Sequence, residues 1–217
     1  MIPFYSHHDQ LKKILTQIVT QPAWHGKWLN TLSYLENCGA RQIAAYEHPT
    51  QVKEDILKHA AEEFRHAYYL KCQIPKVCAI SLNHYSKKYL LGGTASLHYL
   101  KNLNVQTSRY LLKTLGLCHT TMKEIAYVLV TYAIEVRATE LYNLYHNILC
   151  QIDTKVRVKS IILEEKEHLD EMTGLIHQWS NGFNYAKQIC LFETQLCQKW
   201  LNAIEQEIQH NPKFSLA

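Results

Sequence analysis

Two Glu-x-x-His segments, Glu63-Phe-Arg-His66 and Glu165-Lys-Glu-His168, have the residue types and spacing of metal ligands. Residues three apart lie on one face of an α-helix, so the carboxylate and the imidazole of each segment can reach the same ion. Carboxylate oxygens and imidazole nitrogens are ligands that iron and manganese accept. The two segments therefore predict a site for transition-metal ions.

Two further glutamates, Glu36 and Glu135, each interrupt an otherwise apolar stripe with helical periodicity. The chain is expected to fold back on itself near residues 49–50 and 151–152. These turns place Glu36 opposite Glu63, and Glu135 opposite the second Glu-x-x-His segment. The four stripes are expected to meet in one core.

Four carboxylates on apolar faces need compensation, because burying even one isolated ion costs several kcal/mol. Two divalent cations would balance them. A buried salt-bridge network without metal would need matching cations, and the stripes offer only His59 besides the two histidines already named. The sequence thus predicts two metal ions with these ligands: Glu36, Glu63, His66, Glu135, Glu165 and His168.

Other residues near the predicted site have less specific patterns. His59 lies one turn before the first Glu-x-x-His segment, which favours a core histidine over a hydrogen-bonding partner of the ligands. Tyr132, on the stripe of the third helix, is a candidate catalytic or hydrogen-bonding tyrosine, with core packing as the alternative. Thr139 would line an oxygen pocket or fill space between helices. Glu62 and Glu164 share faces with charged residues and predict ordinary solvated surfaces.

The elements that position these residues are all helical, and no segment has the pattern of a strand. The sequence predicts one domain, 1–217, with an additional N-terminal and an additional middle helix. The main expected elements are core hairpins at about 23–73 and 119–180, a crossover at 74–118 and a C-terminal helix at about 183–209. Gly39 and Gly174 fall inside helices and are expected to allow close packing.

The charge, the cysteine content and the apolar runs of the chain indicate which partners and which compartment to expect. The 217 residues carry a formal net charge of +4, which is too mild to favour nucleic acid as a partner. The seven cysteines contain no Cys-x-x-Cys pair and predict free, buried thiols in a reducing compartment. No signal peptide is apparent, and the longest apolar run, 125–134, is too short to span a membrane. We therefore expect a cytoplasmic protein without a membrane partner.

The order Glu, Glu-x-x-His, Glu, Glu-x-x-His resembles that of the ferritin-like di-iron carboxylate superfamily. The resemblance covers roughly residues 25–73 and 119–180. It implies an all-α, ferritin-like four-helix bundle with one long crossover connection. It also implies two iron ions, or a Mn/Fe or Mn/Mn pair, held by the six residues listed above.

The same resemblance implies an oxygen-activating oxidoreductase. Because additional helices commonly cap a substrate cavity, we expect an oxidase or hydroxylase (monooxygenase) of a small organic substrate, supplied by an unidentified electron donor. The alternatives are a ferroxidase or iron-binding protein and a tRNA-modifying di-iron hydroxylase. The heptad spacing of apolar residues in the C-terminal helix favours packing within the chain, with a homodimer seam as the alternative.

Overall fold

The computed structural model describes residues 4–48 and 50–211, without the side chains of 114, 115, 119 and 120. In this part of the chain the secondary structure is entirely helical, which confirms the all-α class. Short 3-10 turns at Ile74–Lys76 and Lys87–Tyr89 lie in the crossover. The α-helices are α1 (His8–Val19), α2 (Pro22–Ala44), α3 (Glu54–Gln73), α4 (Thr94–Leu115), α5 (His119–Gln151), α6 (Lys159–His177) and α7 (Gly182–His210).

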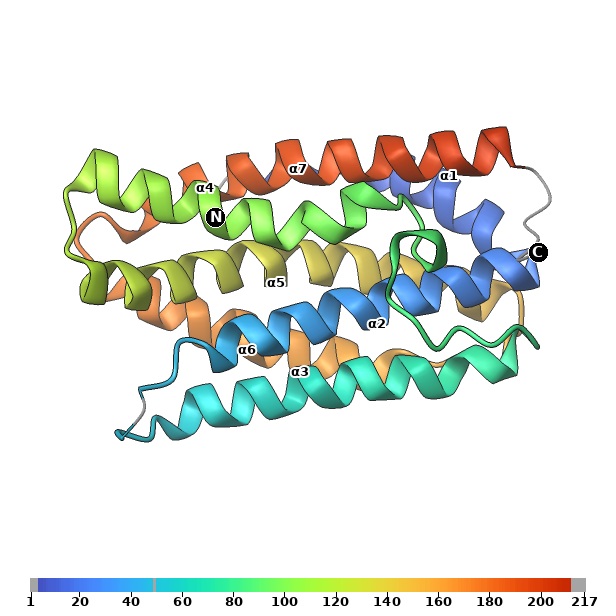
Figure 1. The fold of residues 1–217 in the computed structure, drawn as a ribbon, viewed down its shortest axis with the longest axis horizontal. Helices are drawn as coiled ribbons and strands as arrows, with labels where there is room; N and C mark the ends of the chain where they lie inside the picture. Colours follow the sequence, from blue (N-terminus) through green and yellow to red (C-terminus); the bar gives the residue numbers. More distant parts are fainter. Residues whose placement is uncertain (1–3, 49, 212–217) are drawn as a thin grey trace.

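Helices α2, α3, α5 and α6 form a bundle of two sequential hairpins. Helix α2 packs on α3, α5 packs on α6, and α3 also contacts α6. Figure 1 shows α3 and α6 on one side, α2 and α5 in the middle, and α4 and α7 on the opposite side. The crossover leads from the end of α3 to α4. Helix α4 packs against α5 and α7 and covers the bundle.

Helix α5 lies at the centre and contacts α1, α4, α6 and α7. Its apolar residues therefore surround the helix instead of forming one stripe. Stacked aromatic rings join the covering helices to the bundle: Trp200 of α7 lies 5.8 Å from Trp28 and 5.3 Å from Tyr99, between ring centroids. The apolar heptad residues of α7 are buried within the chain, as expected, at Ile189, Cys190, Leu196, Cys197 and Ile204.

The chain folds back after α5, near the expected position of 151–152, but the connection to α6 is longer than a turn. Helix α6 begins only at Lys159, and residues 152–158 form a longer loop. Asp153 adopts a left-handed backbone conformation with φ of 46°, which ends the preceding helix. Val156 and Val158 are both fully buried, so hydrophobic burial holds this loop against the core.

The structure contradicts two expectations, one about the glycines inside helices and one about the burial of the cysteines. A Cβ built on Gly39 would find only Glu63 Oε2, at 3.6 Å, and one built on Gly174 would find no atom within 4 Å. The contact at Gly39 is an ordinary one and Gly174 borders open space, so neither position requires a glycine for close packing. Among the cysteines, Cys72, Cys118 and Cys150 are exposed, contrary to the prediction of buried thiols. No helix in the described part of the chain is long and apolar enough to cross a membrane.

Candidate metal centre

The residues predicted from sequence as metal ligands lie together near the middle of the bundle. Helix α2 supplies Glu36, α3 supplies Glu63 and His66, α5 supplies Glu135, and α6 supplies Glu165 and His168. All are buried except Glu36, which is partly buried. The helical spacing of the two Glu-x-x-His segments points each carboxylate and imidazole into the same core.

One possible ligand group consists of Glu36, Glu63, His66 and Glu165. One ligand atom of each residue lies within 4.8 Å of the others. His66 Nδ1 is 3.2 Å from Glu165 Oε1 and 3.8 Å from Glu63 Oε1. Two atoms that share one metal ion at about 2.1 Å lie roughly 3–4 Å apart. The spacing of this group therefore suits a common ion.

A second group consists of His59, Glu63, Glu135 and His168, again with ligand atoms within 4.8 Å of one another. His168 Nδ1 is 3.5 Å from Glu63 Oε1 and 3.9 Å from Glu135 Oε1. Glu63 belongs to both groups. A carboxylate has two oxygens, so Glu63 can bridge two ions, one in each group.

His59 is the ligand candidate that the sequence interpretation missed, because it favoured a histidine satisfied within the core. Its Nδ1 lies 3.0 Å from the Tyr127 hydroxyl. Its Nε2 has no hydrogen-bond partner and lies 3.5 Å from Glu135 Oε1. The signal was present in the sequence, since His59 is one helical turn before Glu63 on the same face.

Unpartnered polar atoms gather at this centre. Buried polar groups are nearly always hydrogen-bonded, so such atoms call for an explanation. In the described residues, the following ligand atoms are buried without a hydrogen-bond partner: His59 Nε2, Glu63 Oε1, His66 Nδ1, Glu135 Oε2, Glu165 Oε1 and His168 Nδ1. They come from facing helices and converge on one another. Metal ions fit this arrangement, because they would satisfy these lone pairs together.

Burial and neighbouring charges shift the pKa values of the carboxyl groups in this cluster. Burial, together with nearby carboxylates, raises the pKa of Glu36 and of Glu135 well above the ordinary value. Burial and the charge of Glu165 raise the pKa of Glu63 to about 8. Burial would also raise the pKa of Glu165, but hydrogen bonds from His168 and His66 hold it below its usual range. Without metal, the cluster therefore keeps protons that divalent cations would displace.

Glu62 and Glu164 are half-buried and contact the ligand histidines, which corrects their interpretation as ordinary solvated residues. Glu62 Oε2 lies 2.9 Å from His168 Nε2, and Glu164 Oε2 lies 2.8 Å from His66 Nε2. Each glutamate precedes a Glu-x-x-His segment and contacts the histidine of the other segment. A carboxylate that accepts the ring N–H of a ligand histidine fixes which nitrogen faces the metal. Here that nitrogen is Nδ1.

Removing either of these partners is expected to weaken metal binding. Glu62→Ala and Glu164→Ala should each lower metal affinity by about 10–100-fold, because the ring of His168 or His66 loses its orienting acceptor. Competition with a fluorescent chelator measures this change. Glu167→Ala, at an exposed position of α6, is the matched control and should bind as the native chain does. Unchanged affinity in both glutamate variants would contradict the orienting role.

Tyr132, the predicted catalytic tyrosine, has no hydrogen bond to the ligands in the described residues. Burial, and then its proximity to Cys190 of α7, raise its pKa to about 12. Helix α5 is surrounded by other helices, so a three-residue step from Glu135 does not decide which neighbour a side chain faces. The tyrosines at the centre are instead Tyr142, which donates a hydrogen bond to Glu36, and Tyr127, which contacts His59.

Two small cavities adjoin the carboxylates. One, of about 70 Å³, is lined mainly by apolar side chains of α2, α4 and α5 and reaches Glu36, Glu63 and Glu135. The other, of about 40 Å³, also reaches Glu63 and Glu135. Gly39 lines both, which explains the open space beside it. Thr139, predicted as an oxygen-pocket residue, lines neither.

Comparison of the chain with protein-family models, curated proteins and solved structures found no significant match. The candidate metal centre therefore rests on the arrangement of this chain's own residues.

Proposed function

We propose that this protein is a di-metal carboxylate oxidoreductase with a ferritin-like bundle, and that it activates oxygen to oxidise or hydroxylate a small organic molecule. The observation that carries the proposal is the sharing of Glu63 by two buried ligand groups. One group offers two carboxylates and two imidazoles, and the other offers three carboxylates and one imidazole. Such a pair suits two divalent ions joined by a bridging carboxylate.

Charge favours a metal pair over a metal-free network. The four glutamates of the two ligand groups would balance the charge of two divalent ions. In the described residues the cluster contains only histidines as cation candidates, and the pKa of His59 is lowered to about 4, first by burial and then by His168. A neutral His59 compensates no carboxylate. Burial lowers the pKa of His168, but bonding to Glu165 outweighs it and raises this pKa to about 9, so His168 compensates only one of the four carboxylates. We take iron as the metal, and Mn/Fe or Mn/Mn pairs use the same ligands.

The residues around the ligands have distinct tasks in this proposal. A bound, reduced metal pair would supply electrons to dioxygen. Glu62 and Glu164 orient the ligand histidines, and Tyr142 donates a hydrogen bond to Glu36. The apolar walls of the adjoining cavities exclude bulk water from the carboxylates. Exclusion of water strengthens the electrostatic interactions at the centre and limits side reactions.

The surroundings of the centre favour an organic substrate over the two alternatives. Apolar cavities beside the carboxylates suit oxygen and a hydrocarbon group. An RNA substrate would need a basic surface at the pocket mouth. A pocket that adjoins the centre instead has an acidic lining: Asp55, Glu124, Asp170 and Glu171, against one basic residue, Lys53.

Oxidation of excess Fe(II) separates the proposal from iron storage. Protein loaded anaerobically with Fe(II) is exposed to oxygen with a large excess of Fe(II), and oxygen uptake and retained iron are measured. We expect oxidation of about two Fe(II) per chain, after which uptake stops until a reductant is added. Continued oxidation with retention of the excess iron would support a ferroxidase instead. Oxygen uptake no faster than without protein would contradict both.

A further inference from the structure

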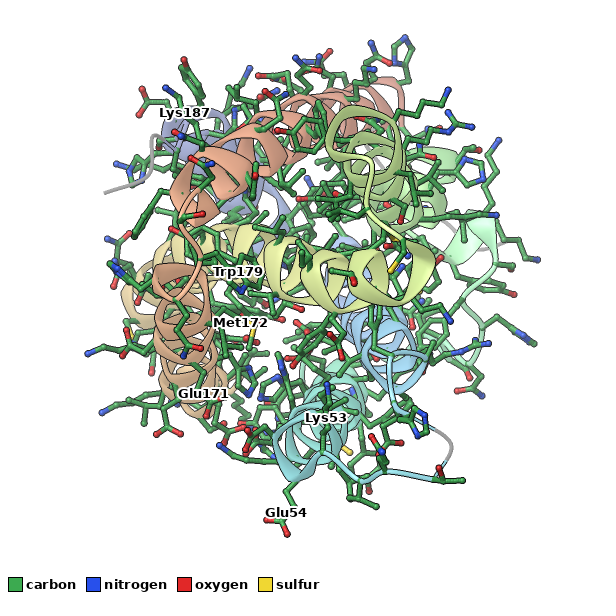
Figure 2. All side chains as sticks on the ribbon, turned by 90° about the vertical axis from the view of Figure 1, so that its left-hand side faces the viewer. Lys53, Glu54, Glu171, Met172, Trp179 and Lys187 are labelled. Carbon is green, nitrogen blue, oxygen red and sulfur yellow. The ribbon has the colours of Figure 1, made fainter. Side chains whose placement is uncertain are left out.

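A large pocket opens at the end of the bundle where α3 and α5 begin and α6 ends. It has a volume of about 640 Å³, within the range of roughly 300–1,000 Å³ typical of small-molecule sites. In Figure 2, which views this end of the molecule, Met172 of α6, Trp179 just after α6 and Lys53 lie around the opening, whereas Glu54 points away from it. We call this feature the end pocket.

The inner wall of the end pocket is apolar and aromatic. Its apolar and aromatic lining residues are Tyr46, Ile56, Tyr127, Val128, Met172, Leu175 and Trp179. Gly174 also lines it, and a Cβ there would meet no atom within 4 Å. Glycine inside a helix costs about 1 kcal/mol relative to alanine, and no packing contact offsets that cost here. The missing side chain widens the pocket instead.

The rim of the end pocket has an excess of negative charge. Glu124 is paired with Lys53 at 3.0 Å, and Glu171 with Lys58 at 3.3 Å. Asp55 and Asp170 make no ion pair in the described part of the chain. These two carboxylates thus remain uncompensated beside an aromatic wall. Carboxylates next to Trp and Tyr rings are the surroundings that favour an organic cation, since the ring faces also attract positive charge.

The end pocket adjoins the metal centre through two tyrosines. Tyr46 and Tyr127 line both the end pocket and the 40 Å³ cavity that reaches Glu63 and Glu135. Their ring centroids are 5.6 Å apart. Tyr46 donates a hydrogen bond to Asn104 Oδ1 at 2.9 Å, and the Tyr127 hydroxyl lies 3.0 Å from His59 Nδ1. The two rings therefore separate the wide outer pocket from the narrow inner cavity.

We propose that the end pocket binds a small organic cation, an amine or ammonium group on a slim apolar body, with the Tyr46–Tyr127 pair standing between its apolar end and the metal centre. The charged group lies at the rim, beside Asp55 and Asp170. The apolar body lies along Val128, Met172 and Trp179. The inner cavities, of about 40 and 70 Å³, admit a chain end or a methyl group but no bulky ring system. The role of this cation as substrate rests on the proposed function, but its binding does not.

Binding of simple amphiphiles tests the pocket directly. The purified full-length chain is titrated with n-octylammonium, with octanoate of the same chain length and with ethylammonium, by calorimetry. Trp179 fluorescence locates the ligand, because it is the half-buried tryptophan while Trp24, Trp28 and Trp200 are buried. We expect n-octylammonium to bind at least about tenfold more tightly than either of the others, a difference of 1.4 kcal/mol or more.

Two variants test the position of the ligand. Gly174→Leu should fill the pocket and weaken n-octylammonium binding by at least about tenfold, a difference of 1.4 kcal/mol. The double variant Asp55→Asn, Asp170→Asn changes only surface charge, and it should bring the affinities for n-octylammonium and octanoate together. Asp9→Asn, on the exposed surface of α1, is the control for loss of one negative charge and should bind normally.

The outcomes separate this inference from the proposed function. The titrations are done with metal-free and metal-loaded protein, and selective amine binding in both supports the end pocket even if oxygen uptake fails. Equal binding of octanoate, absence of n-octylammonium binding, or native affinity in both the Gly174→Leu and the double aspartate variants would overturn the inference. Metal loading and oxygen uptake could still stand in that case.

Discussion

Replacing Glu63 with alanine is expected to remove both metal ions from the protein. The residue belongs to both ligand groups, so its loss leaves each with three candidates and breaks the carboxylate bridge. No other residue belongs to both groups. By the same reasoning, His168→Ala affects one group directly and should lower metal content less than Glu63→Ala does. Metal content after anaerobic loading and desalting, measured by elemental analysis, checks this order.

Glu47→Ala is the matched control, because Glu47 lies beyond the end of α2 and is in neither ligand group. It should retain native metal content. Glu63→Gln preserves side-chain volume and guards against a folding defect in the alanine variant, and it should also lose metal because a neutral amide is a weak ligand. Native metal content in folded Glu63→Ala would show that Glu63 is not a bridging ligand.

The second large effect is a fall in the stability of the metal-free protein as pH rises from 6.5 to 8. Glu63 has its pKa raised from 4.5 to about 8 in the folded protein, chiefly by burial and then by Glu165. Burial lowers the pKa of His168, but bonding to Glu165 outweighs it and raises this pKa to about 9. Both groups hold protons more tightly in the folded than in the unfolded state. Stability from such groups is present at low pH and is lost as pH approaches the folded pKa.

Groups whose pKa is lowered in the folded protein do not cancel this fall in stability between pH 6.5 and 8. The pKa of His59 is lowered to about 4, so its contribution to stability increases as pH rises from 4 to 6.5 and changes little above 6.5. The lowered pKa of Glu165 acts only below its ordinary value of 4.5. One extra proton held by the folded state changes stability by about 1.4 kcal/mol per pH unit. Over this window that is about 2 kcal/mol per group, or roughly 4–8 °C in Tm.

Metal should reverse the trend, since the ions require deprotonated carboxylates and release their protons on binding. Thermal unfolding of metal-free and metal-loaded protein at several pH values measures both curves. We expect the stabilisation by metal to grow from pH 6.5 to 8, because the loaded protein no longer depends on carboxyl protons. A metal-free Tm that rises over this window, or a Tm shift on metal addition that shrinks with pH, would contradict the buried-carboxyl cluster.

The ligand positions were predictable from sequence because they depend on helical periodicity and on height along each helix. Glu36 and Glu135 each interrupt an apolar stripe, and a buried charge on such a stripe points to a compensating partner. The connection after α5 is longer than a turn at 151–152 would be, because Val156 and Val158 bury a loop of residues 152–158. The six predicted residues still lie close together, since the position of α6 along the bundle depends on packing as well as on loop length.

Relations between helices were harder to predict. Glu62 and Glu164 look solvated on their own helices, and only the approach of α3 to α6 brings each to the opposite histidine. Among the described residues, Tyr132 makes no hydrogen bond to the ligand candidates for a related reason: α5 is buried on several sides, so an apolar stripe does not identify which neighbour a side chain faces. His59 lay on the right face, but a histidine in a core is ambiguous until the partners of both ring nitrogens are known.

Anomalous X-ray diffraction from crystals of protein loaded with Fe(II) under anaerobic conditions tests the metal centre most directly. Data on both sides of the iron absorption edge locate each ion and identify it. The proposal predicts two iron peaks in the bundle core, one beside His66 and Glu36, the other beside His59 and His168, with Glu63 between them. A single peak, or no peak among these side chains at saturating metal, would contradict the di-metal centre.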